Sequence, residues 1–102
     1  HSWYTVRMTI QSIRQKTIPL FQQYRVRKAA LFGSIARGEE QSGSDVDILV
    51  EMPENSGLFD FLALQSDLEE LLSYPVDLVE YSAIKERLKP YILHDQTPIF
   101  TV

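Results

Sequence analysis

The sequence predicts one small α/β or α+β domain, a mixed β-sheet with helices packed on at least one of its faces. Three observations lead to this fold class. The chain has 102 residues, enough for a single core. Its 44% hydrophobic and 24% charged residues are ordinary globular composition. Helical and strand patterns alternate along it, which is typical of a sheet layered with helices.

The first half of the chain predicts one helix and two strands. Residues 9–24 carry apolar side chains at helical spacing, and Pro19 is expected to kink or break this helix. Residues 26–32 are a short apolar run that stops at Gly33, which predicts a strand closed by a turn. Residues 45–52 alternate between polar and apolar side chains and predict a second strand.

The second half adds two helices and a third strand. Residues 58–73 predict a helix with its apolar side chains at helical spacing, namely Leu58, Phe61, Leu62, Leu68, Leu71 and Leu72. Residues 76–80 predict a short strand. Ser82 is the expected N-cap of a last helix, bent or broken at Pro90. Its expected apolar face consists of Ile84, Leu88, Tyr91 and Ile92. Residues 98–102 form either a terminal strand or a tail.

Composition and charge narrow the function classes. The chain has no cysteine and no apolar run long enough to span a bilayer, so a cytoplasmic protein is expected. We expect residues 1–7 to be a foreign or disordered start and residues 8–102 to form the single domain. Residues 38–84 hold twelve acidic side chains and no Lys or Arg. This field argues against unaided binding of nucleic acid, and it suits a divalent cation or a basic partner.

Two carboxylates stand in the second predicted strand. Residues two apart share a face of a strand, so Asp45 and Asp47 project together while Val46 and Ile48 face the other way. Like charges held this close are offset most simply by a divalent metal, and oxygen ligands without Cys or a nearby His favour Mg²⁺ or Mn²⁺. The alternative is that both carboxylates lie on the solvent face of an edge strand.

Two further features extend this pattern. Gly33 and Ser34 follow a strand and offer backbone N–H groups and a hydroxyl, which suit a phosphate, although a Gly-Ser pair alone is usually a plain turn. Asp77 completes a triad of acids if its strand neighbours that of Asp45 and Asp47. Otherwise Asp77 is an exposed strand residue.

The stretch FGSIARGEEQSGSDVDILV, residues 32–50, resembles the signature of the DNA polymerase β-type nucleotidyltransferase superfamily: Gly-Ser, ten residues, then Asp-X-Asp. The ARGE segment, the Ser44-Asp45 pair and the later VDLVE resemble the minimal nucleotidyltransferases (MNT) in particular. The likeness covers roughly residues 10–93 and implies a polymerase β-type nucleotidyltransferase core.

The resemblance also implies roles for single residues. Asp45, Asp47 and Asp77 would be catalytic and would hold two Mg²⁺ ions, or Mn²⁺, with Asp77 helping to activate the attacking hydroxyl. The residues that would bind the nucleotide are Gly33, Ser34, Arg37 and Ser44. For Arg37 an ion pair with Glu39 or Glu40 is the alternative to a phosphate contact.

The function that the resemblance implies is that of an antitoxin. Such a protein transfers AMP from ATP to a tyrosine of a partner HEPN-type ribonuclease toxin and releases pyrophosphate. It forms a cytoplasmic hetero-oligomer with the toxin, without direct contact to nucleic acid or membrane. Two alternatives stay open: a non-catalytic antitoxin that occludes its toxin, and a small-molecule nucleotidyltransferase whose acceptor is bound by a separate subunit.

Overall fold

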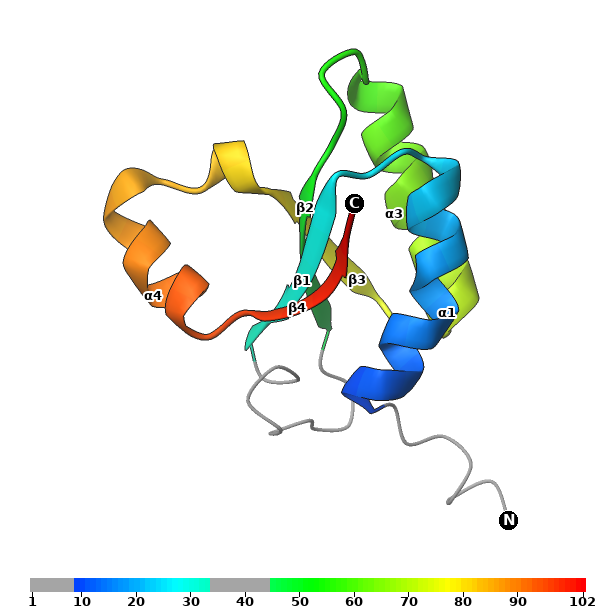
Figure 1. The fold of residues 1–102 in the computed structure, drawn as a ribbon, viewed down its shortest axis with the longest axis horizontal. Helices are drawn as coiled ribbons and strands as arrows, with labels where there is room; N and C mark the ends of the chain where they lie inside the picture. Colours follow the sequence, from blue (N-terminus) through cyan, green and yellow to red (C-terminus); the bar gives the residue numbers. More distant parts are fainter. Residues whose placement is uncertain (1–8, 34–44) are drawn as a thin grey trace.

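The computed structural model describes residues 9–33 and 45–102 of the chain, and these form a mixed α/β fold (Figure 1). The predicted fold class is confirmed. The helices and strands, in chain order, are α1 (Ile10–Gln23), β1 (Lys28–Phe32), β2 (Val46–Glu51), α3 (Leu58–Leu72), β3 (Val76–Glu80), α4 (Lys89–His94) and β4 (Thr97–Thr101). Two short 3₁₀ turns, η2 (Tyr81–Ala83) and η3 (Glu86–Leu88), connect β3 to α4.

The four strands lie in the order β3-β2-β1-β4. β1 pairs antiparallel with both β2 and β4, whereas β2 and β3 are parallel. A parallel pair needs a crossover connection, and α3 provides it. In Figure 1, α1 and α3 lie on one side of the sheet and the segment from η2 to α4 lies on the other.

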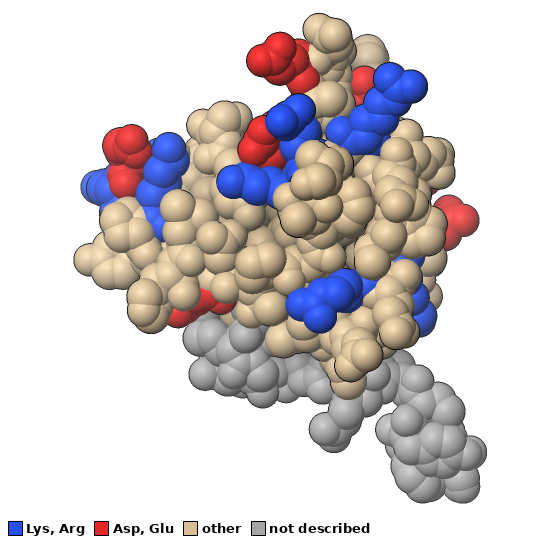
Figure 2. Space-filling view, viewed as in Figure 1, with Lys and Arg blue, Asp and Glu red and all other residues tan. Residues whose placement is uncertain are grey.

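The basic side chains of the described residues lie outside the segment that runs from β2 to η2. Figure 2 shows Lys and Arg gathered over the turn between α1 and β1, and again over η3 and α4. The described basic residues are Arg14, Lys16, Arg25, Arg27, Lys28, Lys85, Arg87 and Lys89. The segment that carries the candidate carboxylates is therefore acidic throughout.

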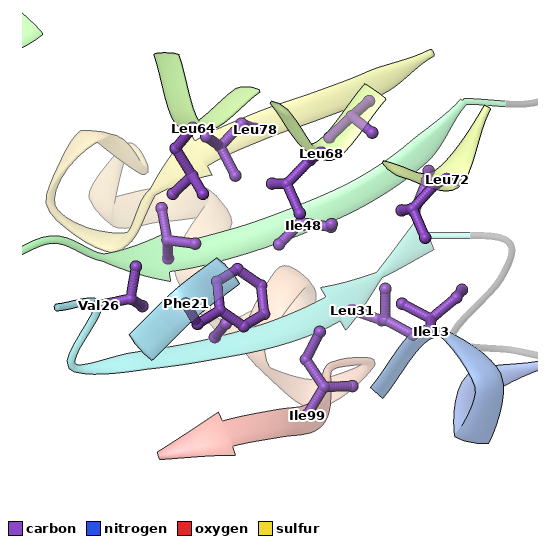
Figure 3. Packing of buried hydrophobic residues seen from close by; sticks show 14 of the residues in the cluster. Ile13, Phe21, Val26, Leu31, Ile48, Leu64, Leu68, Leu72, Leu78 and Ile99 are labelled. Carbon is purple, nitrogen blue, oxygen red and sulfur yellow. The ribbon is translucent and has the colours of Figure 1, made fainter. Parts of the chain in front are cut away.

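The main core lies between the sheet and the helices α1 and α3 (Figure 3). Side chains of α3 and α1 point toward those of β1 and β2, among them Leu68, Phe21 and Ile48. The residues of β2 on this face, Val46, Ile48 and Val50, are fully buried. Because alternate residues of a strand face opposite ways, Asp45, Asp47 and Leu49 belong to the other face.

Helix α1 runs without interruption through Pro19, so the predicted break is wrong. The helix begins with a capping box, in which Thr9 and Ser12 each accept a hydrogen bond from the other's backbone N–H. Pro19 removes the helical bond to the carbonyl of Gln15, but both residues are exposed, so water can solvate that carbonyl. The opposite side of α1, including Phe21, is buried against the core and holds the helix in place.

The single helix predicted from Ser82 is also wrong. Ser82 lies in η2 and caps nothing, and helical structure resumes in η3 and the short α4. Pro90 sits in the first turn of α4, the part of a helix that tolerates proline, so the chain starts a helix there instead of continuing one. The end of the chain, left open by the sequence, forms the edge strand β4, and Arg14 Nη2 donates to the carbonyl of Pro98 at 2.9 Å.

The apolar stripe predicted for α3 is only partly right. Leu68 and Leu72 are buried as expected, together with Leu64. Leu58, Leu62 and Leu71 instead are 69%, 48% and 40% exposed. A helix resting on a sheet buries one stripe, and α3 has more apolar side chains than that stripe can hold.

Tyr24 links the end of α1 to α3, because its hydroxyl donates to Asp67 Oδ2 at 2.5 Å. This hydrogen bond, with burial and the negative charge of Asp67, raises the pKa of Tyr24 from 10.0 to about 12. Since the pKa is raised on folding, the stabilisation is complete below pH 10 and is lost as the pH rises toward 12.

Tyr24→Phe is therefore expected to lower the free energy of unfolding by about 1 kcal/mol at neutral pH. Between pH 10 and 12 the free energy of unfolding of the variant should also fall less than that of the parent chain. Urea denaturation at several pH values measures both effects, with Tyr91→Phe as the control because Tyr91 is 74% exposed. An unchanged alkaline decline in Tyr24→Phe would contradict the assignment.

No helix within residues 9–33 and 45–102 is both long and apolar enough to cross a membrane.

Candidate functional site

Asp45 and Asp47 lie at the start of β2, on the sheet face turned away from α1 and α3. Asp45 is exposed immediately before the strand, and Asp47 is half-buried within it. β2 lies between β3 and β1, so the alternative that this Asp-X-Asp belongs to an edge strand is wrong. Farther along the same face Leu49 is fully buried, where η2 contacts β2. The face is thus covered at its far end and carries the acids at its near end.

The strand of Asp77 neighbours that of Asp47, which is the condition that the sequence set for a triad of acids. It pairs in register with Asp47 across the parallel strands β2 and β3. Register partners in a parallel pair share a face, and neighbouring strands lie about 4.8 Å apart. Asp77 is exposed, on the edge strand of the sheet. Two acids that are far apart in the sequence therefore stand side by side.

The register of β3 is fixed by hydrogen bonds around its first residue. The backbone N–H of Val76 donates to Glu69 Oε2 at 3.0 Å, and Gln65 Nε2 donates to the carbonyl of Val76 at 2.9 Å. The N–H of Val46 donates to the carbonyl of Pro75 at 2.9 Å. Side chains of α3 thus hold the strand that carries Asp77, so the position of this acid depends on the docked helix.

Gly33 lies against Asp47 at the end of β1. Its φ of +76° falls in the left-handed region that only glycine adopts without strain. A Cβ at this position would overlap Oδ2 of Asp47. Phe32, the preceding residue, is the register partner of Asp47 in β2. Both the backbone conformation and the close approach therefore require glycine beside the carboxylate.

The other predicted nucleotide-binding residues, Ser34, Arg37 and Ser44, lie outside the described residues. Their roles stay predictions.

The donor set of this face fits a hard divalent cation. Asp45, Asp47 and Asp77 supply only carboxylate oxygens, the ligands that Mg²⁺ and Mn²⁺ prefer. As the side chains stand, no three acidic or histidine groups in the described ranges are close enough together to hold a metal. The backbone nevertheless places Asp47 and Asp77 side by side on one face of adjacent strands, with Asp45 immediately before β2.

A second charged cluster on this face gave no signal in the sequence. Lys28 Nζ lies 3.9 Å from Glu51 Oε1 and 4.5 Å from the centre of the Tyr81 ring. Burial, and then the charge of Glu51, raise the pKa of Tyr81, whose hydroxyl donates to Gln96 Oε1 at 2.8 Å. These contacts hold η2 and the approach to β4 over the far end of the face. Strand register brings Lys28 and Glu51 together, and η2 adds Tyr81 to them.

Carboxylates gathered on adjacent strands suit divalent cations, and such cations assist the class of enzymes that transfers phosphorus-containing groups. The family comparison agrees with this class. The model of the family "Polymerase beta, Nucleotidyltransferase" matches residues 15–102, and the chain belongs to this family of nucleotidyltransferases.

Curated relatives cover most of the chain. A protein of Methanocaldococcus jannaschii, provisionally named protein adenylyltransferase MJ0435, is 40% identical over 92 residues, which are 90% of this chain and 99% of that protein. Protein adenylyltransferase MntA of Thermococcus cleftensis is 41% identical over 76 residues, which are 74% of this chain and 77% of the relative.

Solved structures show the same fold. One, described provisionally as a minimal nucleotidyltransferase, superposes with a TM-score of 0.79 at 32% identity, over 90% of this chain and 97% of the other. The structure of a tri-AMPylated Shewanella oneidensis HEPN toxin in complex with MNT antitoxin contains one chain that superposes on this one. The TM-score is 0.70 at 21% identity, over 92% of this chain and 74% of the other. The predicted resemblance to minimal nucleotidyltransferases is confirmed.

Proposed function

We propose that residues 8–102 act as one Mg²⁺-dependent protein adenylyltransferase domain that transfers AMP from ATP to a tyrosine of a partner HEPN-type toxin. The observation that carries the proposal is the pairing of Asp47 with Asp77, next to a glycine whose missing Cβ leaves room for the carboxylate. Relatives at 40% and 41% identity bear the name protein adenylyltransferase, which supports a protein as the acceptor.

Each residue of the site has a part in this reaction. Asp45, Asp47 and Asp77 would hold two Mg²⁺ ions, which when bound lower the pKa of the attacking hydroxyl and neutralise the leaving pyrophosphate. Gly33 and Ser34 would hold the triphosphate through backbone N–H groups and the hydroxyl, and Arg37 and Ser44 would add contacts to the nucleotide. The Asp77 carboxylate would orient the tyrosine hydroxyl and accept its proton.

The proposed reaction is a nucleotidyl transfer. The tyrosine oxygen forms a bond to the α-phosphorus of ATP, and the bond from that phosphorus to the bridging oxygen of the β-phosphate breaks. Pyrophosphate leaves, and the product is an AMP-tyrosine phosphodiester. The acidity of residues 38–84 suits a basic protein partner and repels nucleic acid, which favours a hetero-oligomer with the toxin. The cytoplasm, which supplies ATP, is the expected compartment.

The experiment that tests the proposal combines this chain with the protein encoded by the neighbouring gene, which the proposal expects to be a HEPN-domain protein. ATP labelled on the α-phosphate should label a tyrosine of that protein in the presence of Mg²⁺, whereas ATP labelled on the γ-phosphate should not. EDTA should abolish the labelling. Neutralisation of the toxin without any label would overturn the transfer and favour occlusion. Labelling of an aminoglycoside in the absence of a protein partner would favour the small-molecule reaction.

A further inference from the structure

The start of α3 exposes a continuous apolar surface. Leu58, Phe59 and Leu62, within five residues of each other on the helix, are 69%, 87% and 48% exposed. Single exposed apolar residues are common on soluble proteins, but large neighbouring ones at a helix start often mark a contact with another molecule.

A pocket of about 410 Å³ continues this surface toward the edge strand β3. Leu58 belongs to both, since it is one of the residues that line the pocket. The other apolar residues of the lining are Met52, Phe61, Leu78, Val79 and Ala83. We call the exposed residues Leu58, Phe59 and Leu62 together with this pocket the α3–β3 surface. An apolar side chain from a partner fits such a pocket.

The charge beside the pocket is negative. Glu80 lines it, and no Lys or Arg is among the described residues of the lining. The carboxylate of Glu80 accepts a hydrogen bond from the N–H of Met52 at 3.3 Å, which holds it at this place. Arg25, on the turn after α1, lines a different cavity together with Asp60 and so does not offset the charge of Glu80 in this lining. A partner that complements the α3–β3 surface therefore has an apolar centre and a Lys or Arg beside it.

The surface also lies within reach of the candidate site. Val79 of the pocket and Asp77 of the site lie two residues apart on the same face of β3. Glu80 is three residues from Asp77, about 10 Å along the strand at roughly 3.3 Å per residue, and its side chain leaves the opposite face of β3. β3 is an edge strand, so a protein lying along it can touch the pocket and present a side chain to the carboxylates together.

We propose that the α3–β3 surface docks the acceptor protein, through a segment that inserts an apolar side chain into the pocket and sets a Lys or Arg on Glu80. The proposal rests on the function above and names the surface that selects its protein substrate. Docking at one end of β3 raises the effective concentration of the acceptor tyrosine at the other end, without a contact to the nucleotide.

The test measures binding of the HEPN-domain partner to the full chain in the presence of the non-hydrolysable nucleotide AMP-PNP. Phe59→Asp with Leu62→Asp is expected to weaken this binding at least tenfold and to leave binding of AMP-PNP by the isolated chain unchanged. Leu71→Asp, at the other end of α3 and 40% exposed, is the matched control and should bind the partner like the parent chain. Circular dichroism checks that each variant is folded.

A second variant tests the charge. Glu80→Gln should weaken partner binding and reduce its salt dependence, because one ion pair across the interface is lost. If the variant with both Phe59→Asp and Leu62→Asp binds the partner as tightly as the parent chain, the docking surface is wrong. It is also wrong if these substitutions dissociate a homodimer of the isolated chain, since a second copy would then be the occupant.

Partner binding that depends on Phe59 and Leu62, without any transfer of AMP, would support the docking surface and contradict the transfer reaction.

Discussion

Replacing Asp45 and Asp47 together by asparagine is expected to reduce the rate of AMP transfer at least about 1,000-fold. Asparagine keeps the size of the side chain but removes the charge that would hold the divalent ions, and loss of this stabilisation costs several kcal/mol in the transition state. The rate is measured as label transferred per minute from ATP labelled on the α-phosphate to the partner.

Two comparisons make this result specific. Glu70→Gln removes one negative charge from an exposed position on α3, away from the carboxylate face, and should transfer AMP like the parent chain. The double aspartate variant should still bind the partner, because the α3–β3 surface is intact. Labelling that persists in the Asp45 and Asp47 variant would remove these residues from the metal site.

Gly33→Ala is expected to lower AMP transfer at least about 100-fold and to destabilise the chain by about 1–2 kcal/mol. The stability loss follows from the φ of +76°, which costs a residue with a Cβ roughly that much. The activity loss follows from the overlap of the new methyl with Oδ2 of Asp47, which must turn away from its place in the site. Thermal denaturation and the labelling assay measure the two effects separately.

Gly57→Ala is the control for the backbone strain, because the φ of −110° at Gly57 is open to every residue type and a Cβ there meets nothing within 4 Å. It should lose less stability than Gly33→Ala. The control for AMP transfer is Glu70→Gln, which should act like the parent chain. If Gly33→Ala transferred AMP as fast as Glu70→Gln, the glycine turn would have no part in positioning Asp47.

The sequence predicted the elements whose patterns are strong and local. The alternation around Asp47 placed β2 within a residue of its observed bounds, and the short run at Asp77 gave the bounds of β3. Prediction failed where tertiary packing overrides a local signal. At Pro19 the buried side of α1 outweighs one missing hydrogen bond, whereas before Pro90 the turns η2 and η3 replace the expected helix.

The spacing of residues in the sequence predicts only part of the candidate site. The face that Asp47 takes follows from the period of a strand, since Val46 and Ile48 on either side of it are buried while Asp47 is only half-buried. The approach of Asp77 could only be stated as a condition, because parallel pairing with β2 joins residues that no local pattern connects. The exposure of Phe59 was equally hidden, since an apolar side chain in a helix predicts burial until the position of the sheet is known.

The alternation of β2 also protects the chain against misfolding. If β2 slipped by one residue against its neighbours, Asp45 and Asp47 would turn into the layer now filled by Val46, Ile48 and Val50. Burying charges in that apolar layer costs several kcal/mol each, so the shifted pairing is strongly disfavoured. The acids proposed for catalysis therefore also act as a check on register, and a variant that neutralises them gives up part of that safeguard while it folds.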